Sequence, residues 1–476
     1  MSNSVQPKYN GIPVQKSVYL FLGKAMPVIM LFFITIIYSR KLSYDDYGTF
    51  QSVWMYTNLL TVTISFGITA LLLSSNLSSF FAFAKKHLIK IISAYLLLLM
   101  VSMSIFFWYG KNFSIGVKFL LILFVLIQII STVLETLLIK SHKERIVFII
   151  NFIYSLLFFG WHYYILSKGY NLSNLIEGII ILSIARFTGM FFFRQKTSVI
   201  PGPLNDKQYF KHWTYLGLND ITGVLSRWID KLLLVYLLTP GEFALFFNGS
   251  FEIPLFGLLV SVVGSVMLIE ISKNISTKEK VMQLFKESFR LLSLIVFPLF
   301  LFLLFFRFEL FSVVFKNKYN ASVPIFLISI FILPVRINNY GSILQYYQHG
   351  NKIMTGSLLD IILAVILMTL FYPFLGTRGI ALAIVLATYC QAFYYLSQSA
   401  KVLQTDILSL IPVKALAQTF VLMLMLYTCL YYSLHKASDN LKLSAALMAT
   451  IIFIFIGLYK YSSKKRSTKY VLISKT

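Results

Sequence analysis

The sequence predicts an all-helical membrane protein that crosses the bilayer many times. Of its 476 residues, 58% are hydrophobic and only 12% are charged, and the mean hydropathy is +0.79. Soluble domains carry about 25% charged residues. Aromatic residues make up 17% of the chain, which suits lipid-facing surfaces and interfacial belts. Long apolar runs recur from one end of the sequence to the other, so we expect a polytopic α-helical protein.

The apolar runs predict about fourteen transmembrane helices, with a count of twelve or thirteen left open. Each span needs about 20 predominantly apolar residues. The first run lacks a small-residue cleavage site, so we expect it to remain as a spanning helix. The predicted spans are residues 18–38, 51–73, 88–109, 116–138, 146–166, 175–193, 213–238, 245–268, 289–313, 322–346, 354–374, 379–399, 412–433 and 443–461.

The basic residues predict the orientation of the chain. A net charge of +25 would suggest nucleic acid as a partner for a soluble protein, but the cytoplasmic loops of membrane proteins collect Lys and Arg. We therefore expect no nucleic-acid partner. Lys and Arg are concentrated on the side that holds both predicted termini, including the tail at Lys464, Lys465 and Arg466. This distribution places both termini in the cytoplasm.

A weak internal repeat indicates two lobes. LSYDDYGTF at residues 42–50 aligns with LTPGEFALF at residues 238–246, at an offset of 196 residues. Six predicted spans separate the copies, so both emerge on the same side of the membrane and the repeat is parallel. The predicted domains are an N-lobe at 1–194 and a linker at 195–212, followed by a C-lobe at 213–400 and an appended segment at 401–476 with two spans and a basic tail.

The seventh predicted span carries charges that a lipid-facing helix would not tolerate. Within residues 213–238 lie Asp220, Arg227, Asp230 and Lys231. An ionised side chain near the bilayer centre costs about 2.5–3.5 kcal/mol on insertion scales. Asp220, Arg227 and Lys231 are spaced by seven and four residues, which sets them along one helix face. Such a face predicts a polar pathway inside the protein.

Other spans also carry charged residues. We predict that a set of cations binds an anionic substrate, and that a set of acids couples transport to an ion or compensates these cations. For Arg227, Lys231 and Arg336, a structural ion pair is the open alternative, and Asp360 is a candidate partner of Arg336. The predicted cations are Lys24, Arg186, Arg227, Lys231 and Arg336, and the predicted acids are Asp220, Asp230, Glu252 and Asp360.

The sequence shows no motif of an enzyme. Metal-ligand spacing, a Gly-rich phosphate loop and a nucleophile–base arrangement are all missing from it. We expect no catalytic residues, no metal site and no cofactor, with coupling to H⁺ or Na⁺ left open. Cys390 and Cys429 both lie in apolar segments, so we expect no structural disulfide.

Four short motifs, taken in order, resemble the Wzx-type oligosaccharide flippases of the multidrug/oligosaccharidyl-lipid/polysaccharide (MOP) superfamily. They are Asp46-Tyr47-Gly48 after the first span, Asp230-Lys231 in the seventh, residues 316–319 after the ninth and residues 376–379 before the twelfth. The resemblance implies a MATE-like fold of two six-helix lobes. It also implies a monomer in the bacterial inner membrane that translocates undecaprenyl-pyrophosphate-linked oligosaccharides for O-antigen or a related polysaccharide. Membrane lipids and the polysaccharide polymerase machinery are the further partners implied.

Physical chemistry supports the same substrate class independently of the resemblance. A pyrophosphate requires cations such as Arg and Lys, and a glycan requires a wet, polar cavity. A drug/cation antiporter of the MATE type is the alternative transporter, but it would favour an acidic lumen. An O-antigen polymerase or ligase, which is a glycosyltransferase, is the alternative of a different class. It would carry a long extracytoplasmic loop, and the predicted topology leaves none.

Overall fold

The computed structural model describes residues 14–75, 77–194, 206–250, 277–347 and 349–473, together with residues 256, 257, 260, 263, 264 and 267. Every regular element in these ranges is a helix. The chain divides into two compact units, Met1–Leu225 and Ser226–Thr476. The predicted lobe and linker boundaries stay a prediction.

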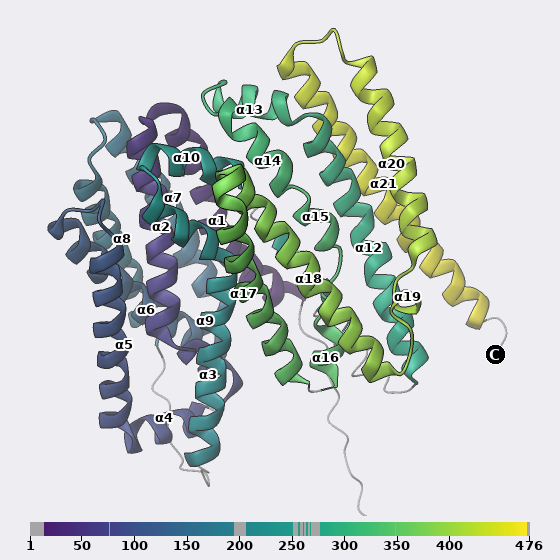
Figure 1. The fold of residues 1–476 in the computed structure, drawn as a ribbon. Helices are drawn as coiled ribbons and strands as arrows, with labels where there is room; N and C mark the ends of the chain where they lie inside the picture. Colours follow the sequence, from purple (N-terminus) through teal and green to yellow (C-terminus); the bar gives the residue numbers. More distant parts are fainter. Residues whose placement is uncertain are drawn as a thin grey trace, which may run out of the picture. The chain divides into compact units, whose positions relative to one another are not determined.

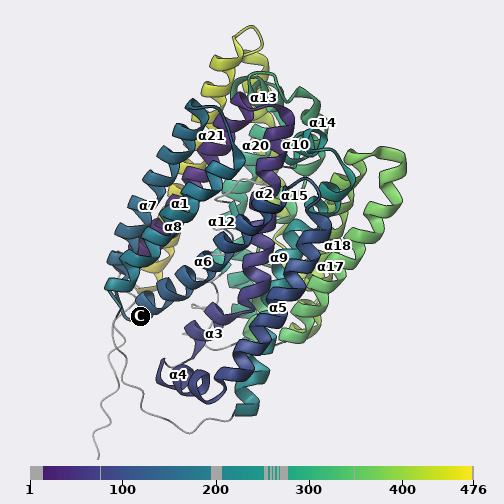
Figure 2. The same ribbon diagram turned by 90° about the vertical axis from the view of Figure 1, so that its left-hand side faces the viewer.

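The first unit is built from long helices that pack in pairs. Helix α1 packs against α7, α6 against α8, and α7 against α8 (Figure 2). A short helix, α4, precedes α5 and lies outside these pairs. The helices are α1 (Val14–Lys41), α2 (Tyr44–Ser65), α3 (Ile68–Ser74), α4 (Leu77–Lys86), α5 (Leu88–Tyr109), α6 (Ile115–Lys140), α7 (Glu144–Ser167), α8 (Leu172–Phe192) and the first two-thirds of α9 (Asp206–Leu237).

The second unit combines long helices with a series of short ones. Helices α17 and α18 form an antiparallel hairpin, and α12 packs against α20 and α21 (Figure 1). After the end of α9, the helices are α10 (Pro240–Gly249), α12 (Lys278–Phe305), α13 (Arg307–Phe315), η1 (Asn320–Ser322), α14 (Val323–Ser329), α15 (Ile332–Val335), α16 (Ser342–Tyr346), α17 (Gly350–Leu375), α18 (Thr377–Leu403), α19 (Ile407–Leu410), α20 (Val413–Ser433) and α21 (Asp439–Ile473).

The predicted fold class is confirmed. The described residues contain ten helices long and apolar enough to cross a membrane, or up to eleven if α2 and α3 form one bent span. The predicted span 88–109 coincides with α5. The predicted span 245–268 lies largely outside the described residues, and α9 is not among the ten helices. The count of fourteen therefore stays a prediction.

The predicted span 322–346 is interrupted, and its chemistry explains why. It consists of α14, α15 and α16 with non-helical residues between them. Pro334 lacks an N–H, and its ring conflicts with the carbonyl of Ile330, four residues earlier, which is where α14 has ended. Farther on, the Asn338 side chain accepts a hydrogen bond from the N–H of Asn339 at 2.8 Å. Such local bonds compete with the helical pattern, so the chain stays irregular up to α16.

The two copies of the sequence repeat adopt the same local structure. Ser43 caps the N-terminus of α2, where its hydroxyl accepts the N–H of Asp46 at 3.0 Å. Thr239 caps α10 in the same way, and its partner Glu242 completes a capping box. An N-cap of this kind contributes about 1 kcal/mol. The aromatic residues that follow at matching positions, Tyr47 and Phe50 against Phe243 and Phe246, are all fully buried.

Candidate functional site

A cavity of about 390 Å³ lies within the second unit. Its walls are the last part of α9, the interrupted segment from α14 to α16, and helices α17 and α18. Ligand pockets typically range from about 300 to 1,000 Å³, so this cavity has room for a substrate group. Five of the nine predicted site residues line it: Arg227, Asp230, Lys231, Arg336 and Asp360.

The end of α9 supplies three of these five charges. Lys231 Nζ lies 3.1 Å from the Asp230 carboxylate, and both side chains are buried. The same ammonium group lies 5.6 Å from the centre of the Trp228 ring. The charges of Lys231 and Asp230 therefore compensate each other, as one of the two sequence-based interpretations of Lys231 proposed.

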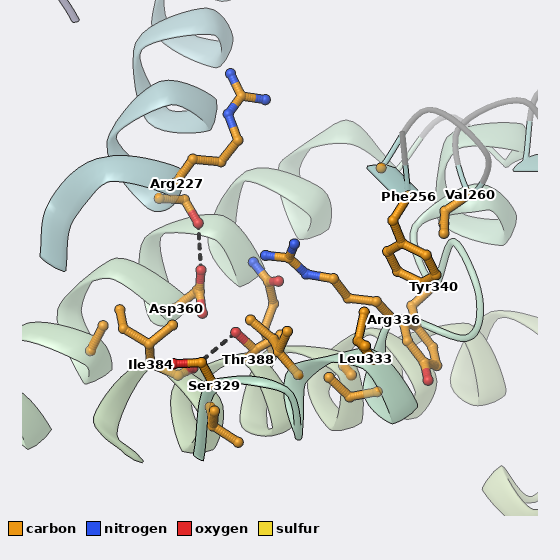
Figure 3. Close-up of a pocket in the computed structure, with 18 of the residues that line it drawn as sticks. Arg227, Phe256, Val260, Ser329, Leu333, Arg336, Tyr340, Asp360, Ile384 and Thr388 are labelled. Carbon is orange, nitrogen blue, oxygen red and sulfur yellow. Dashed lines mark hydrogen bonds between the residues drawn. The ribbon is translucent and has the colours of Figure 1, made fainter. Parts of the chain in front are cut away.

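Across the cavity, Asp360 on α17 connects two elements. It accepts a hydrogen bond from the Ser226 hydroxyl of α9 at 2.5 Å. It also interacts electrostatically with Arg336, which ends α15. Figure 3 shows the guanidinium of Arg336 directed toward Asp360. This arrangement agrees with the alternative in which Asp360 is the partner of Arg336.

Arg227 differs from the other two cations of the cavity. Its side chain is exposed, and Figure 3 shows its guanidinium directed away from Asp360. Within the described ranges, no carboxylate forms a salt bridge with it. With Lys231 paired to Asp230 and Arg336 close to Asp360, Arg227 is the cation that leaves this lining with a net positive charge.

The interrupted segment contributes a wall that sequence reasoning did not predict. Asn338, Asn339 and Tyr340 line the cavity there. Asn338 is buried and accepts the Ser288 hydroxyl of α12 at 2.8 Å. In a membrane, irregular backbone is tolerated where it lines a cavity or is buried in protein. The cluster of Pro334, Asn338, Asn339 and Gly341 was the signal in the sequence that could have indicated it.

The other predicted residues lie elsewhere. Lys24 is exposed on α1, and Asp220 is half-buried on α9, both in the first unit. Arg186, on α8 of the same unit, is held by three side chains. Its Nη2 lies 2.5 Å from Glu135, its Nε donates to Asn151 at 2.9 Å and its Nη1 to Gln128 at 3.3 Å. Glu252 lies outside the described residues. The predicted roles of Lys24 and Arg186 in substrate binding, and of Asp220 and Glu252 in ion coupling or charge compensation, stay predictions.

The fold is that of transporters of the MOP superfamily. The lipid II flippase MurJ in an inward closed conformation matches with a TM-score of 0.67 at 14% identity, covering 95% of this chain and 99% of that chain. A MOP superfamily transporter from Pyrococcus furiosus, reported to have a binding pocket of reverse polarity, matches with a TM-score of 0.58 at 14% identity, covering 82% of this chain and 95% of that chain. An inward-facing multidrug resistance MATE family transporter matches with a TM-score of 0.54 at 13% identity, covering 81% of this chain and 98% of that chain.

The sequence itself identifies the family. Residues 37–324 match the family described as polysaccharide biosynthesis protein. This match covers more than half of the chain, which therefore belongs to that family. No curated protein sequence matches the chain. The predicted resemblance is confirmed by this family match and by the fold that the chain shares with transporters of the MOP superfamily.

Proposed function

We propose that this protein translocates undecaprenyl-pyrophosphate-linked oligosaccharide repeat units across the bacterial inner membrane. The observation that carries the proposal is the position of Arg227. Arg227, which forms no salt bridge among the described residues, lines the cavity about two-thirds of the way along α9, within the span predicted at residues 213–238. Burying a charge in a membrane is costly, so such residues normally serve a pathway or a ligand. A guanidinium binds phosphate oxygens in bidentate fashion.

The remaining parts of the substrate match the rest of the cavity. Carboxamide and hydroxyl groups, among them Asn339, Thr388 and Gln391, provide donors and acceptors for sugar hydroxyls. The polyprenyl chain stays in the lipid during translocation. Lys24 on α1 is proposed as a second cation for the pyrophosphate, since it lies on the helix that the sequence repeat relates to α9. Alternating access of the two units would carry the head group across.

The acids of the cavity have a separate proposed role. Asp230 and Asp360 compensate Lys231 and Arg336, and we propose Asp360 as the site where H⁺ or Na⁺ couples to transport. A carboxylate bound by one hydroxyl and facing one cation has room for a competing ion. Both termini are proposed to lie in the cytoplasm, and no further cofactor is required by this mechanism.

Complementation of a bacterial strain that lacks its polysaccharide flippase tests the proposal. Expression of the wild-type chain should restore surface polysaccharide. Arg227→Ala should reduce export at least about tenfold, since loss of one charge-assisted contact to an anion corresponds to about 1.5–3 kcal/mol, and Arg227→Lys should retain part of it. Arg290→Ala is the matched control, because Arg290 is an exposed arginine of α12 outside the cavity lining.

Two results would contradict the proposal. Full export by Arg227→Ala, at an expression level equal to wild type, would remove the role of the cavity cation. Equal losses in Arg227→Ala and Arg290→Ala would show that any exposed arginine has the same effect. A different outcome would favour the drug antiporter: the wild-type chain would confer resistance to a cationic drug and would not restore polysaccharide export.

A further inference from the structure

A proline inside α1 leaves a main-chain carbonyl without its usual partner. In an α-helix, the carbonyl of each residue accepts the N–H of the residue four positions later. Pro27 lies inside α1 and has no N–H, so the carbonyl of Gly23 lacks the donor that an α-helix normally supplies. Within a span there is no bulk water to replace that donor. The Gly23 carbonyl therefore requires a donor from another helix.

The side chain of Asn151, on α7, supplies this donor. Its Nδ2 lies 3.2 Å from the carbonyl oxygen of Gly23, and Asn151 is only 1% exposed. Gly23 also permits the close approach of the two helices, since a Cβ at this position would lie 3.3 Å from the Cα of Phe148 on α7. The packing of α1 against α7 thus brings the amide to the carbonyl that Pro27 leaves open.

Glu135 and Arg186 determine which way the Asn151 amide faces. Its Oδ1 accepts a hydrogen bond from Arg186 Nε at 2.9 Å, and its Nδ2 also donates to Glu135 Oε2 at 3.4 Å. The opposite orientation would set the NH₂ group against a guanidinium and the amide oxygen against a carboxylate. Since Arg186 and Glu135 are themselves in contact, the pair holds the amide nitrogen toward Gly23.

We infer that Asn151, oriented by Arg186 and Glu135, is a positioning residue that fixes the course of α1 at Pro27 and thereby the placement of Lys24. Lys24 directly follows Gly23, so any rearrangement of this carbonyl turns the Lys24 side chain as well. Arg186 then acts on α1 through Asn151. The consequence for transport rests on the role of Lys24 in the proposed function, whereas the consequence for helix geometry does not.

The test exploits the missing N–H of Pro27. In a background where Cys390 and Cys429 are replaced by Ser, Lys24→Cys provides a thiol whose rate of modification by a water-soluble maleimide in membranes reports the geometry of α1. Adding Asn151→Ala should change this rate several-fold, because the Gly23 carbonyl loses its donor. Adding Pro27→Ala as well restores an N–H four residues after Gly23 and should return the rate to that of the parent.

Ser155→Ala is the matched control, since the buried Ser155 hydroxyl one turn later on α7 bonds, among the described residues, to the carbonyl of Asn151 alone. It should leave the rate unchanged. If Asn151→Ala fails to accumulate in the membrane, Pro27→Ala should recover its accumulation.

An unchanged rate in Asn151→Ala, or a defect that Pro27→Ala does not correct, would overturn the inference. The labelling requires no substrate, so suppression by Pro27→Ala supports the inference even where export proves independent of Lys24. The labelling experiment can therefore contradict the positioning of α1 without contradicting the proposed function, and the export assay can do the reverse.

Discussion

Several basic side chains of this chain serve as caps for helix C-termini. Lys140 Nζ lies 2.6 Å from the carbonyl of Leu72 near the end of α3, and Lys143 Nζ lies 2.7 Å from that of Phe193, the C-cap residue of α8. The last carbonyls of a helix have no partner within the helix and carry a partial negative charge. Part of the high net charge therefore has a structural use.

At the same scale, the Asp230–Lys231 pair distinguishes structural from substrate-binding charges. Removing one member leaves a buried charge without a partner, which typically destabilises by about 3–5 kcal/mol. Asp230→Ala and Lys231→Ala should each lower the unfolding temperature of the purified protein, while the double substitution Asp230→Leu, Lys231→Met should recover much of that loss.

Export by the double variant then decides the role of Lys231. A stable double variant that still exports polysaccharide would show that the pair is structural. A stable but inactive one would support substrate contact. A double variant that is no more stable than the single variants would contradict the ion pair itself.

At the scale of elements, the bend between α2 and α3 depends on two glycines. The helices meet at an angle of 52°, and Phe66 and Gly67 there have φ values of 39° and 70°. The carbonyl of Phe66 accepts the indole N–H of Trp213 on α9 at 2.8 Å. A Cβ on Gly217 of α9 would lie 2.6 Å from the Phe66 ring. The first part of α9 is thus tightly packed against the bend.

This contact predicts opposite effects for two glycine substitutions in one helix. Gly217→Ala should destabilise the protein by about 1–3 kcal/mol, as over-packing commonly does. Gly223→Ala should be neutral or stabilising, because nothing lies within 4 Å of its Cβ position and alanine favours a helix over glycine by up to about 1 kcal/mol. Thermal unfolding in detergent measures both, and equal shifts would contradict the packing at the bend.

Sequence periodicity and hydropathy predicted the long helices because these features are local. The span 88–109 is uninterrupted and apolar, and its bounds agree with α5. The interruption around Pro334 was missed because the average hydropathy of residues 322–346 hides two prolines and two asparagines. The partners of Arg186 could not be predicted either. Gln128, Glu135 and Asn151 lie on two other helices, and only tertiary packing brings them together.

At the scale of the whole molecule, the cavity residues of α9 were predictable from charge alone. Arg227, Asp230 and Lys231 stood out because a spanning helix excludes charges that have no function. What the sequence left open was which charges compensate one another, because pairing depends on side-chain positions. The structure resolves this pairing among the charges that line the cavity and leaves Arg227 as the exposed cation of that lining.

The central claim is that the protein moves an anionic lipid-linked glycan across a bilayer. Its most direct measurement is translocation of a fluorescent undecaprenyl-pyrophosphate-linked oligosaccharide in proteoliposomes. Translocation is detected when the fluorescent head group becomes accessible to a membrane-impermeant quencher. The account predicts translocation by the wild-type protein and by Arg290→Ala, and a strong reduction in Arg227→Ala. Wild-type translocation no faster than in protein-free liposomes, with and without gradients of H⁺ and Na⁺, would contradict it.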